Sequence, residues 1–243
     1  MSNTSNFFKT KKRWSIYKDK LLENYLPLYL SKILATGRDT LFIDGFAGKG
    51  KFDDGTDGSP IIIRDKIEQA CASTRYHSKI TPIFIEYNKK YAITLQQALN
   101  RDWCYVLNND YKEEALNILS RTKNKDKNIF MYVDPFGIKH LRYNVFSTLA
   151  ANQNSVELLL NFNSFGFIRE GCRLLGVEID EEFGSFEEGD EDNFSNSIEN
   201  MNAIANGTYW QDIIAQKKRG YYFWKRSGKV IYSAILECTR SRF

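Results

Sequence analysis

Short apolar runs alternate with amphipathic segments along the first two thirds of the chain. The apolar runs cover residues 40–44, 81–86, 103–107, 128–133 and 155–162, and they have the length and composition of buried parallel strands. Between them lie helical patterns at residues 59–74, 89–100, 112–121 and 141–151. This order predicts an α/β fold with a mostly parallel central sheet and helices on both faces, joined by right-handed crossovers.

The ends of the chain have different patterns. Residues 14–35 repeat apolar positions every three or four residues, which predicts a helix that Pro27 should kink or divide. Nine acidic residues and no basic ones lie between positions 178 and 192. An Asn- and Ser-rich stretch follows. We therefore expect a single domain with a basic helical segment (1–38), a core (39–165), a poorly ordered insertion or lid (166–215) and a C-terminal hairpin (216–243).

A glycine-rich turn follows the first predicted strand. The strand ends at Asp44 and continues as Gly45-Phe46-Ala47-Gly48-Lys49-Gly50. Gly48 and Gly50 let the backbone approach a ligand closely, and Gly45 permits a sharp exit from the strand. A phosphate-binding loop would continue with Gly-Lys-Ser/Thr. The chain has Gly50-Lys51-Phe52 instead, which disfavours a nucleoside triphosphatase.

Two further acids follow the next two predicted strands. Glu86 ends the second strand, where an acid can accept hydrogen bonds from both hydroxyls of a ribose. It lies further from Gly50 than the roughly 20 residues usual in dinucleotide folds, so residues 51–74 form an inserted loop and helix. Asp110 follows the third strand, where its carboxylate could accept a hydrogen bond from an adenine amino group. The alternative for both acids is a carboxylate that simply faces water.

Asp134-Pro135-Phe136-Gly137 follows the fourth predicted strand. The Asp134 carboxylate and a main-chain carbonyl could accept hydrogen bonds from an exocyclic amine, and Phe136 could stack on a flipped base. Such chemistry is a matter of positioning and needs no strong base, since the amine loses its proton after the transfer. The alternative is an ordinary tight turn punctuated by Pro135 and Gly137.

Together these motifs resemble known methyltransferases. The segment from Phe42 to Gly50 resembles the D-x-F-A-G-x-G of ribosomal RNA guanine-N2 methyltransferases, and residues 134–137 resemble the D-P-F-G of tRNA guanine-N2 dimethyltransferases and, less closely, the D-P-P-Y of adenine-N6 enzymes. The whole pattern over residues 10–165, with Gly58-Ser59-Pro60, is similar to the bacterial three-Cys-motif partner protein family, TcmP.

This resemblance implies a Rossmann-like class I methyltransferase fold that binds S-adenosylmethionine. The cofactor-binding residues it implies are Asp44, Gly45, Phe46, Gly48, Gly50, Glu86, Tyr87 and Asp110, and the catalytic ones are Asp134, Pro135 and Phe136. Family members are encoded beside a radical-SAM-type partner protein in mobile-element or phage-linked systems. They also run longer than 243 residues, so we expect the chain to lack a last strand.

Charge and cysteine usage limit the remaining possibilities. The net charge of +4 is mild, but the start of the chain concentrates basic residues that could meet the phosphates of DNA or RNA. The four cysteines are scattered and the two histidines, His77 and His140, are far apart, so we expect no disulfide framework and no metal site. Without a signal peptide or a membrane-spanning stretch, a cytoplasmic location is expected.

The leading hypothesis is a methyltransferase that uses S-adenosylmethionine to methylate an exocyclic amine of a nucleic-acid base. A second hypothesis is a methyltransferase-like partner subunit with little catalysis of its own, for which the acidic and Asn-rich stretch 178–206 would serve as a docking segment. An NAD-dependent oxidoreductase, which would share the glycine-rich turn and Glu86, ranks last. A nuclease would need clustered carboxylates, which only the acidic run supplies.

Overall fold

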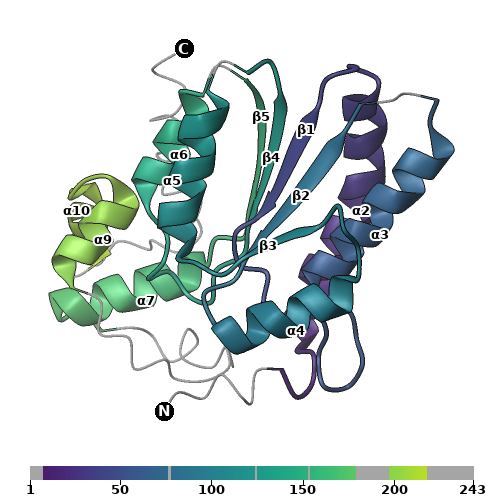
Figure 1. Ribbon diagram of the computed structural model, residues 1–243. Coiled ribbons are helices and arrows are strands. Elements are labelled where there is room, and N and C mark those ends of the chain that lie inside the picture. Colours follow the sequence, from purple (N-terminus) through teal and green to yellow (C-terminus); the bar gives the residue numbers. More distant parts are fainter. Residues whose placement is uncertain (1–7, 76–77, 124, 153, 179–196, 218–243) are drawn as a thin grey trace. The chain divides into compact units, whose positions relative to one another are not determined.

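The protein is described here by a computed structural model that covers residues 8–75, 78–123, 125–152, 154–178 and 197–217. Its centre is a five-stranded, all-parallel sheet in the order β3-β2-β1-β4-β5 (Figure 1). The strands are β1 (Thr40–Asp44), β2 (Ile80–Ile85), β3 (Tyr105–Leu107), β4 (Asn128–Val133) and β5 (Ser155–Leu160). The predicted α/β class and parallel sheet are confirmed, and the arrangement is Rossmann-like.

The first strand, β1, lies in the middle of the sheet. The next two strands are added on one side of it, and the last two are added on the other side. The chain runs outward from β1 to β3, then returns to place β4 beside β1. Asp44, the last residue of β1, therefore pairs with Phe84 of β2 on one side and with Tyr132 of β4 on the other. In open parallel sheets ligands bind beyond the carboxyl ends of the strands at such a reversal. The order of the strands thus determines where a site can form.

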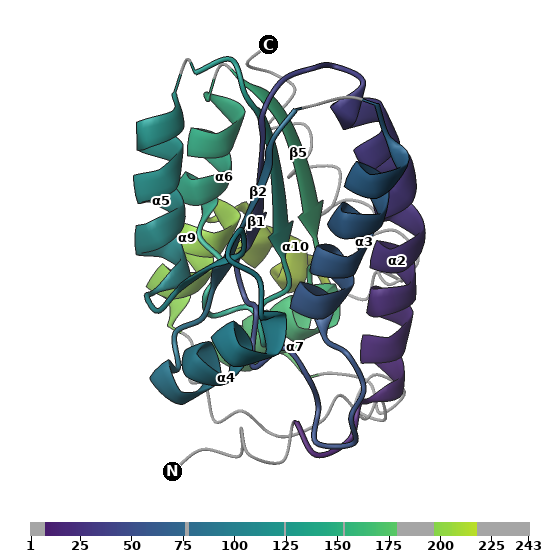
Figure 2. The same cartoon turned by 45° about the vertical axis from the view of Figure 1, so that its right-hand side comes forward.

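Helices lie on both faces of this sheet. They are α2 (Arg13–Leu34), α3 (Ser59–Ser73), α4 (Lys89–Leu99) and α5 (Tyr111–Thr122). In Figures 1 and 2, α2 and α3 lie on one face and α5 lies on the other. Right-handed crossovers account for this, because the connections from β1 to β3 run one way across the sheet and the connection from β3 to β4 runs back.

The main core lies between α2, α3 and the sheet. Phe42 of β1 and Phe130 of β4 are fully buried and stack with their ring centroids 4.2 Å apart. Tyr29 of α2 packs on Phe130 at 4.8 Å. Leu22, Leu26 and Leu30 recur at helical spacing and are also fully buried. Each such side chain contributes about 1.5–3 kcal/mol of burial free energy, so the apolar stripe fixes α2 against the sheet.

The helix predicted at residues 14–35 is confirmed, but Pro27 does not divide it. Pro27 lies inside the continuous helix α2 and is exposed. A proline inside a helix removes one hydrogen bond to the carbonyl four residues earlier. That carbonyl belongs to Glu23, which is exposed as well, so water can replace the missing partner.

A second compact unit comprises the described parts of residues 136–150 and 162–217. Its helices are α6 (Tyr143–Ala150), α7 (Ser164–Leu175), α9 (Ile198–Ala205) and α10 (Tyr209–Lys217). Trp210 is fully buried, meets Phe167 edge to face at 6.0 Å, and donates from Nε1 to Asn202 at 2.8 Å.

The second unit corrects two expectations from the sequence. Where it describes the predicted poorly ordered insertion 166–215, the structure shows helices, because a few apolar residues recur at helical spacing among the polar ones. Residues 136–150 group with this unit rather than with the predicted core 39–165. The acidic run beyond residue 178 and the predicted hairpin strands at 221–224 and 230–232 lie outside the described residues.

None of the described helices has the length and apolar content needed to cross a membrane.

Two leucines of α2 provide a matched test of the core. Leu26 is fully buried, whereas Leu28 is 69% exposed. We expect Leu26→Ala to lower the free energy of unfolding by about 2–5 kcal/mol, since it leaves a cavity. Leu28→Ala should change it by less than about 0.5 kcal/mol. Urea unfolding followed by circular dichroism measures both, and equal losses would contradict the packing described for α2.

Candidate functional site

The glycine-rich turn after β1 is held by both neighbouring strands. The Gly45 amide donates to the Tyr132 carbonyl of β4 at 2.9 Å, and the Ala47 amide donates to the Ile85 carbonyl of β2 at 3.1 Å. Gly48 and Gly50 have φ angles of +65° and +84°, which only glycine adopts readily. The turn therefore has a fixed shape at the carboxyl end of β1, between the ends of β2 and β4.

Gly45 and Phe46 are explained by the packing of α5 against this turn. A Cβ atom on Gly45 would lie 2.6 Å from the ring of Tyr111, the first residue of α5. The Phe46 ring packs on the same tyrosine, with centroids 4.7 Å apart. The sequence predicted both residues as cofactor-binding. The structure shows Gly45 making room for Tyr111, and the cofactor role of each stays a prediction.

Asp44 is completely buried and is bound by the turn that follows it. Its Oδ1 accepts a hydrogen bond from the Phe46 amide at 3.1 Å, and its Oδ2 accepts one from the Ser59 hydroxyl at 2.8 Å. Burial raises the pKa of Asp44 to about 7 against the lowering effect of these bonds, and the negative charges of Asp134 and Glu86 add to the rise. Asp44 thus ties the start of α3 to the glycine-rich turn.

Glu86 joins the end of β2 to the same turn. Its Oε2 accepts a hydrogen bond from the Gly48 amide at 2.8 Å, and its Oε1 accepts one from the Asn88 amide at 2.7 Å. Partial burial raises the pKa of the Glu86 carboxyl. Each oxygen still has acceptor capacity for a ligand hydroxyl. The neighbouring Tyr87 ring is 79% exposed and is available for stacking.

Asp110 begins α5 as its N-cap. Its Oδ1 accepts hydrogen bonds from the Lys112 and Glu113 amides at 2.9 and 3.3 Å. The role predicted for it, binding an adenine amino group, would fall to Oδ2. Sequence reasoning missed Asn108, whose Nδ2 donates to the carbonyls of Glu86 and Tyr87 at 2.8 and 2.9 Å. The only feature of the sequence that pointed to Asn108 is the Asn-Asn-Asp run that follows β3.

Asp134 at the end of β4 is engaged by a residue that sequence reasoning did not single out. Lys18 of α2 places its ammonium 2.6 and 2.7 Å from the two carboxylate oxygens of Asp134. The Tyr132 hydroxyl is 3.4 Å from Asp134 Oδ2 and receives a hydrogen bond from Asn161 Nδ2 at 3.0 Å. No sequence pattern links Lys18 to Asp134, because 116 residues separate them.

The rest of the Asp-Pro-Phe-Gly motif divides between the two units. Pro135 is buried and belongs to the first unit, whereas Phe136 belongs to the second. The structure therefore brings together Asp44, Gly48, Glu86 and Asp134 at the carboxyl ends of three adjacent strands. The stacking role of Phe136 and the part of Pro135 in catalysis stay predictions.

The start of the described chain runs along the loop that follows the glycine-rich turn. The Phe8 carbonyl accepts from the Asp53 amide at 2.7 Å, and a Cβ on Gly48 would lie 3.1 Å from the Phe8 ring. Lys11 forms an ion pair with Asp19 and donates to the Asp57 carbonyl at 2.5 Å. One lysine of the predicted basic segment, Lys11, is thus engaged by groups of the protein itself.

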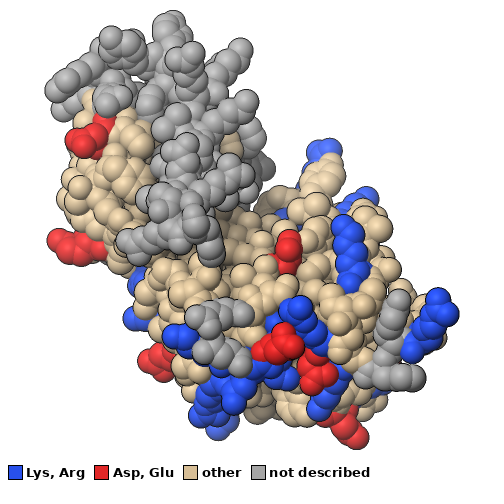
Figure 3. Space-filling view, turned by 90° about the horizontal axis from the view of Figure 1, so that it is seen from above, with Lys and Arg blue, Asp and Glu red and all other residues tan. Residues whose placement is uncertain are grey.

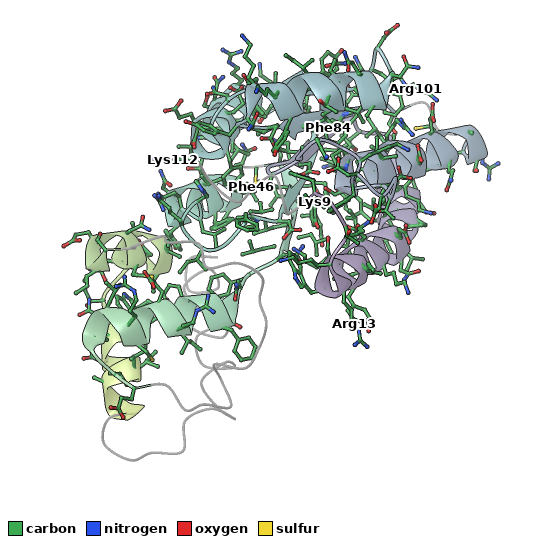
Figure 4. The ribbon with its side chains drawn as sticks, turned by 90° about the horizontal axis from the view of Figure 1, so that it is seen from below. Lys9, Arg13, Phe46, Phe84, Arg101 and Lys112 are labelled. Atoms are coloured by element: carbon green, nitrogen blue, oxygen red, sulfur yellow. The ribbon has the colours of Figure 1, made fainter. Side chains whose placement is uncertain are left out.

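Other basic residues of this segment remain exposed. Figure 4 looks onto the carboxyl ends of the strands, with Phe46 near the middle, Lys9 and Arg13 on the α2 side and Lys112 at the start of α5. Lys9, Arg13, Lys20 and Lys112 are all exposed. Of these, Lys9, Arg13 and Lys112 are seen at the end of the sheet that carries the candidate site (Figure 4).

The opposite end of the sheet carries basic and acidic residues together (Figure 3). Arg38 pairs with Asp126 and Lys127 pairs with Asp39, each at 3.4 Å. Across the described ranges, no three His, Cys, Asp or Glu side chains are placed to hold a metal ion. His140 is exposed, and His77 lies outside those ranges.

The raised pKa of Asp44 predicts a pH-dependent stability. Between about pH 4 and pH 7 the unfolded chain has lost this proton while the folded chain keeps it, so the free energy of unfolding falls as the pH rises through that window. Asp44→Asn cannot ionise, and its stability relative to wild type should rise over the same window, by at most about 4 kcal/mol.

Urea unfolding of both proteins at pH 4.5 and pH 7.5 measures this difference. Asp102→Asn, at an exposed position, serves as the control and should follow the wild type. Parallel pH curves for Asp44→Asn and wild type would contradict the buried, proton-holding carboxyl.

Comparison of the chain with protein-family models, with curated proteins and with solved structures gave no match. The resemblance to TcmP therefore stays an expectation from the sequence.

Proposed function

We propose that the protein is a methyltransferase that binds S-adenosylmethionine and methylates an exocyclic amine of a nucleic-acid base. One observation carries the proposal. The hydrogen bond from the Gly48 amide to Glu86 joins the glycine-rich turn of β1 to the acid that follows β2, and Asp134 lies at the end of β4, the other neighbour of β1. A glycine-rich turn, an acid suited to a ribose and an acid suited to an amine thus share one end of the sheet.

The residues at this end fit the chemical groups of the cofactor. Glu86 has acceptor positions for the two ribose hydroxyls, and the exposed Tyr87 ring next to it offers a surface for adenine. The Gly48 amide holds the Glu86 carboxylate in place beside the turn. Asp44 contributes indirectly, because both its oxygens bind protein donors and hold the turn in shape. When bound, the cofactor supplies an electrophilic methyl group on its sulfonium.

Asp134 fits the acceptor side of the reaction. Lys18 and Tyr132 both lie within donor reach of its carboxylate, so Asp134 acts as a hydrogen-bond acceptor. An exocyclic amine that donates to Asp134 would have its nitrogen held in place for the transfer, and positioning of this kind supplies a large part of catalysis. The amine releases its proton afterwards.

The surroundings of the site favour a polyanionic substrate. Lys9, Arg13 and Lys20 are exposed at or near the start of α2, the helix that supplies Lys18. Exposed lysines and arginines neutralise phosphates, and binding of this kind weakens steeply as salt rises. DNA and RNA both fit this description.

Titration calorimetry with S-adenosylmethionine is the first test. The wild type should bind it. Glu86→Gln should weaken binding roughly 10- to 100-fold, because charge-assisted hydrogen bonds contribute about 1.5–3 kcal/mol. The exposed Glu23→Gln is the matched control and should bind like wild type. Asp134→Asn should do so too, since we place Asp134 on the acceptor side.

The contrary outcomes are distinct. A folded wild type that does not bind S-adenosylmethionine would overturn the proposal and favour the methyltransferase-like partner subunit, which co-purification with the product of a neighbouring gene would test. Loss of cofactor binding in Asp134→Asn would instead overturn the division of roles between Glu86 and Asp134.

Methyl transfer itself is the second test. Wild type and Asp134→Asn are each incubated with methyl-tritiated S-adenosylmethionine and, separately, total tRNA, total rRNA and genomic DNA. One of these pools is expected to be labelled by wild type. On that pool the rate of methyl transfer by Asp134→Asn should be lower than that of wild type by about 100-fold or more, since its amide has lost one acceptor oxygen. Equal rates would exclude Asp134 from orienting the amine.

A further inference from the structure

The ion pair between Lys18 and Asp134 brings a residue of α2 into the candidate site. The ammonium lies 2.6 and 2.7 Å from the two oxygens of Asp134, and the two side chains are only 24% and 22% exposed. It also lies 4.2 Å from the ring centroid of Trp14, one helical turn earlier on the same face of α2. A carboxylate and an aromatic face thus hold this ammonium together.

The helix that carries Lys18 is firmly fixed. Leu22, Leu26 and Leu30 are fully buried along α2, and Lys18 lies one turn before Leu22 on the same stripe. Lys11 forms an ion pair with Asp19, the residue next to Lys18. Lys18 is therefore a built part of this end of the sheet, in contrast to a surface lysine that reaches across by chance.

A second donor approaches Asp134 from the sheet. Asn161 Nδ2 donates to the Tyr132 oxygen at 3.0 Å, which leaves the Tyr132 proton to point to Asp134 Oδ2 at 3.4 Å. A carboxylate has about four acceptor positions, two on each oxygen. Lys18 takes one on each oxygen and Tyr132 takes the second on Oδ2. With respect to the described residues, Oδ1 keeps one acceptor position.

The charges around Asp134 explain why a cation is needed there. The negative charge of Asp134 adds to the effect of burial in raising the pKa of Asp19, Asp44 and Tyr132. Asp134 thus shares its neighbourhood with other acidic groups. Lys18 is the positive group in direct contact with its carboxylate. A half-buried carboxylate without such a partner is costly to keep ionised.

We propose that Lys18 is a positioning residue for methyl transfer, which holds the Asp134 carboxylate turned so that the remaining acceptor position of Oδ1 receives the substrate amine. The inference rests on the proposed function. Lys18 acts through Asp134 and not on the methyl group. Its ammonium has no lone pair, so Lys18 is not itself the methyl acceptor while the ion pair stands.

The test compares Lys18→Met, Lys18→Arg and the control Lys32→Met, which changes an exposed lysine in the last turn of the same helix. Each variant is assayed with methyl-tritiated S-adenosylmethionine and the nucleic-acid pool that wild type labels best. Lys18→Met should lower kcat roughly 10- to 100-fold with the KM for nucleic acid and the affinity for S-adenosylmethionine unchanged. Lys18→Arg should restore most of kcat, and Lys32→Met should match wild type.

A double variant distinguishes positioning by Lys18 from a purely structural role of Lys18. Because Lys18 acts through Asp134, Lys18→Met should lower the rate no further in an Asp134→Asn background. Tyr132→Phe removes the second donor without changing charge, and it should lower kcat in the same way, to a smaller extent. This variant keeps the proposal testable where Lys18→Met does not fold, a point that thermal unfolding checks.

Several outcomes would overturn the proposal. A kcat of Lys18→Met equal to that of Lys32→Met would exclude positioning by Lys18. A higher kcat would mean that Lys18 blocks the amine position and must leave before substrate binds. If wild type labels no nucleic acid or does not bind the cofactor, the proposed function fails and the inference falls with it. If wild type binds the cofactor and transfers methyl groups but Lys18→Met has no effect, the inference about Lys18 is wrong and the proposed function still stands.

Discussion

The buried carboxyl group of Asp44 lies at the end of β1, and its hydrogen bonds hold the turn that follows. The strand order places β1 between β2 and β4, and the Asp44 side chain at its end is completely buried. The Ser59 hydroxyl and the Phe46 amide satisfy the carboxyl there. Through these two bonds one buried residue links a strand, a turn and the start of a helix.

The other polar groups of the site follow from this arrangement. With the turn fixed, the Gly48 amide meets Glu86, and the end of β2 is joined to β3 through Asn108. Asp134 follows on the other side of β1. Burial raises the pKa of both Asp44 and Glu86, and the negative charges of Asp134 and Glu86 raise the pKa of Asp44 further. Perturbed carboxyl groups gathered at one end of a sheet are typical of functional sites.

Helix α2 takes part in both the core and the site. Its leucine stripe packs on the sheet, and the same helix delivers Lys18 to Asp134. A change in the packing of α2 would therefore reach the site through Lys18. The core of the second unit, around Trp210 and Phe167, is built separately from its own helices.

The sequence by itself determined the five strands, the helices between them and the acids at the strand ends, but not the helices found within residues 166–215. Apolar runs and helical spacing located all five strands, and Asp44, Glu86 and Asp134 follow from where those runs stop, since the ends of parallel strands share one edge. Local patterns could not reveal partners that are distant along the chain. The pairing of Lys18 with Asp134, the bonds of Asn108 and the packing of Tyr111 on Gly45 depend on how crossovers bring remote segments together. Only the tertiary structure decided them, because side-chain contacts between distant residues leave no periodic trace in the sequence.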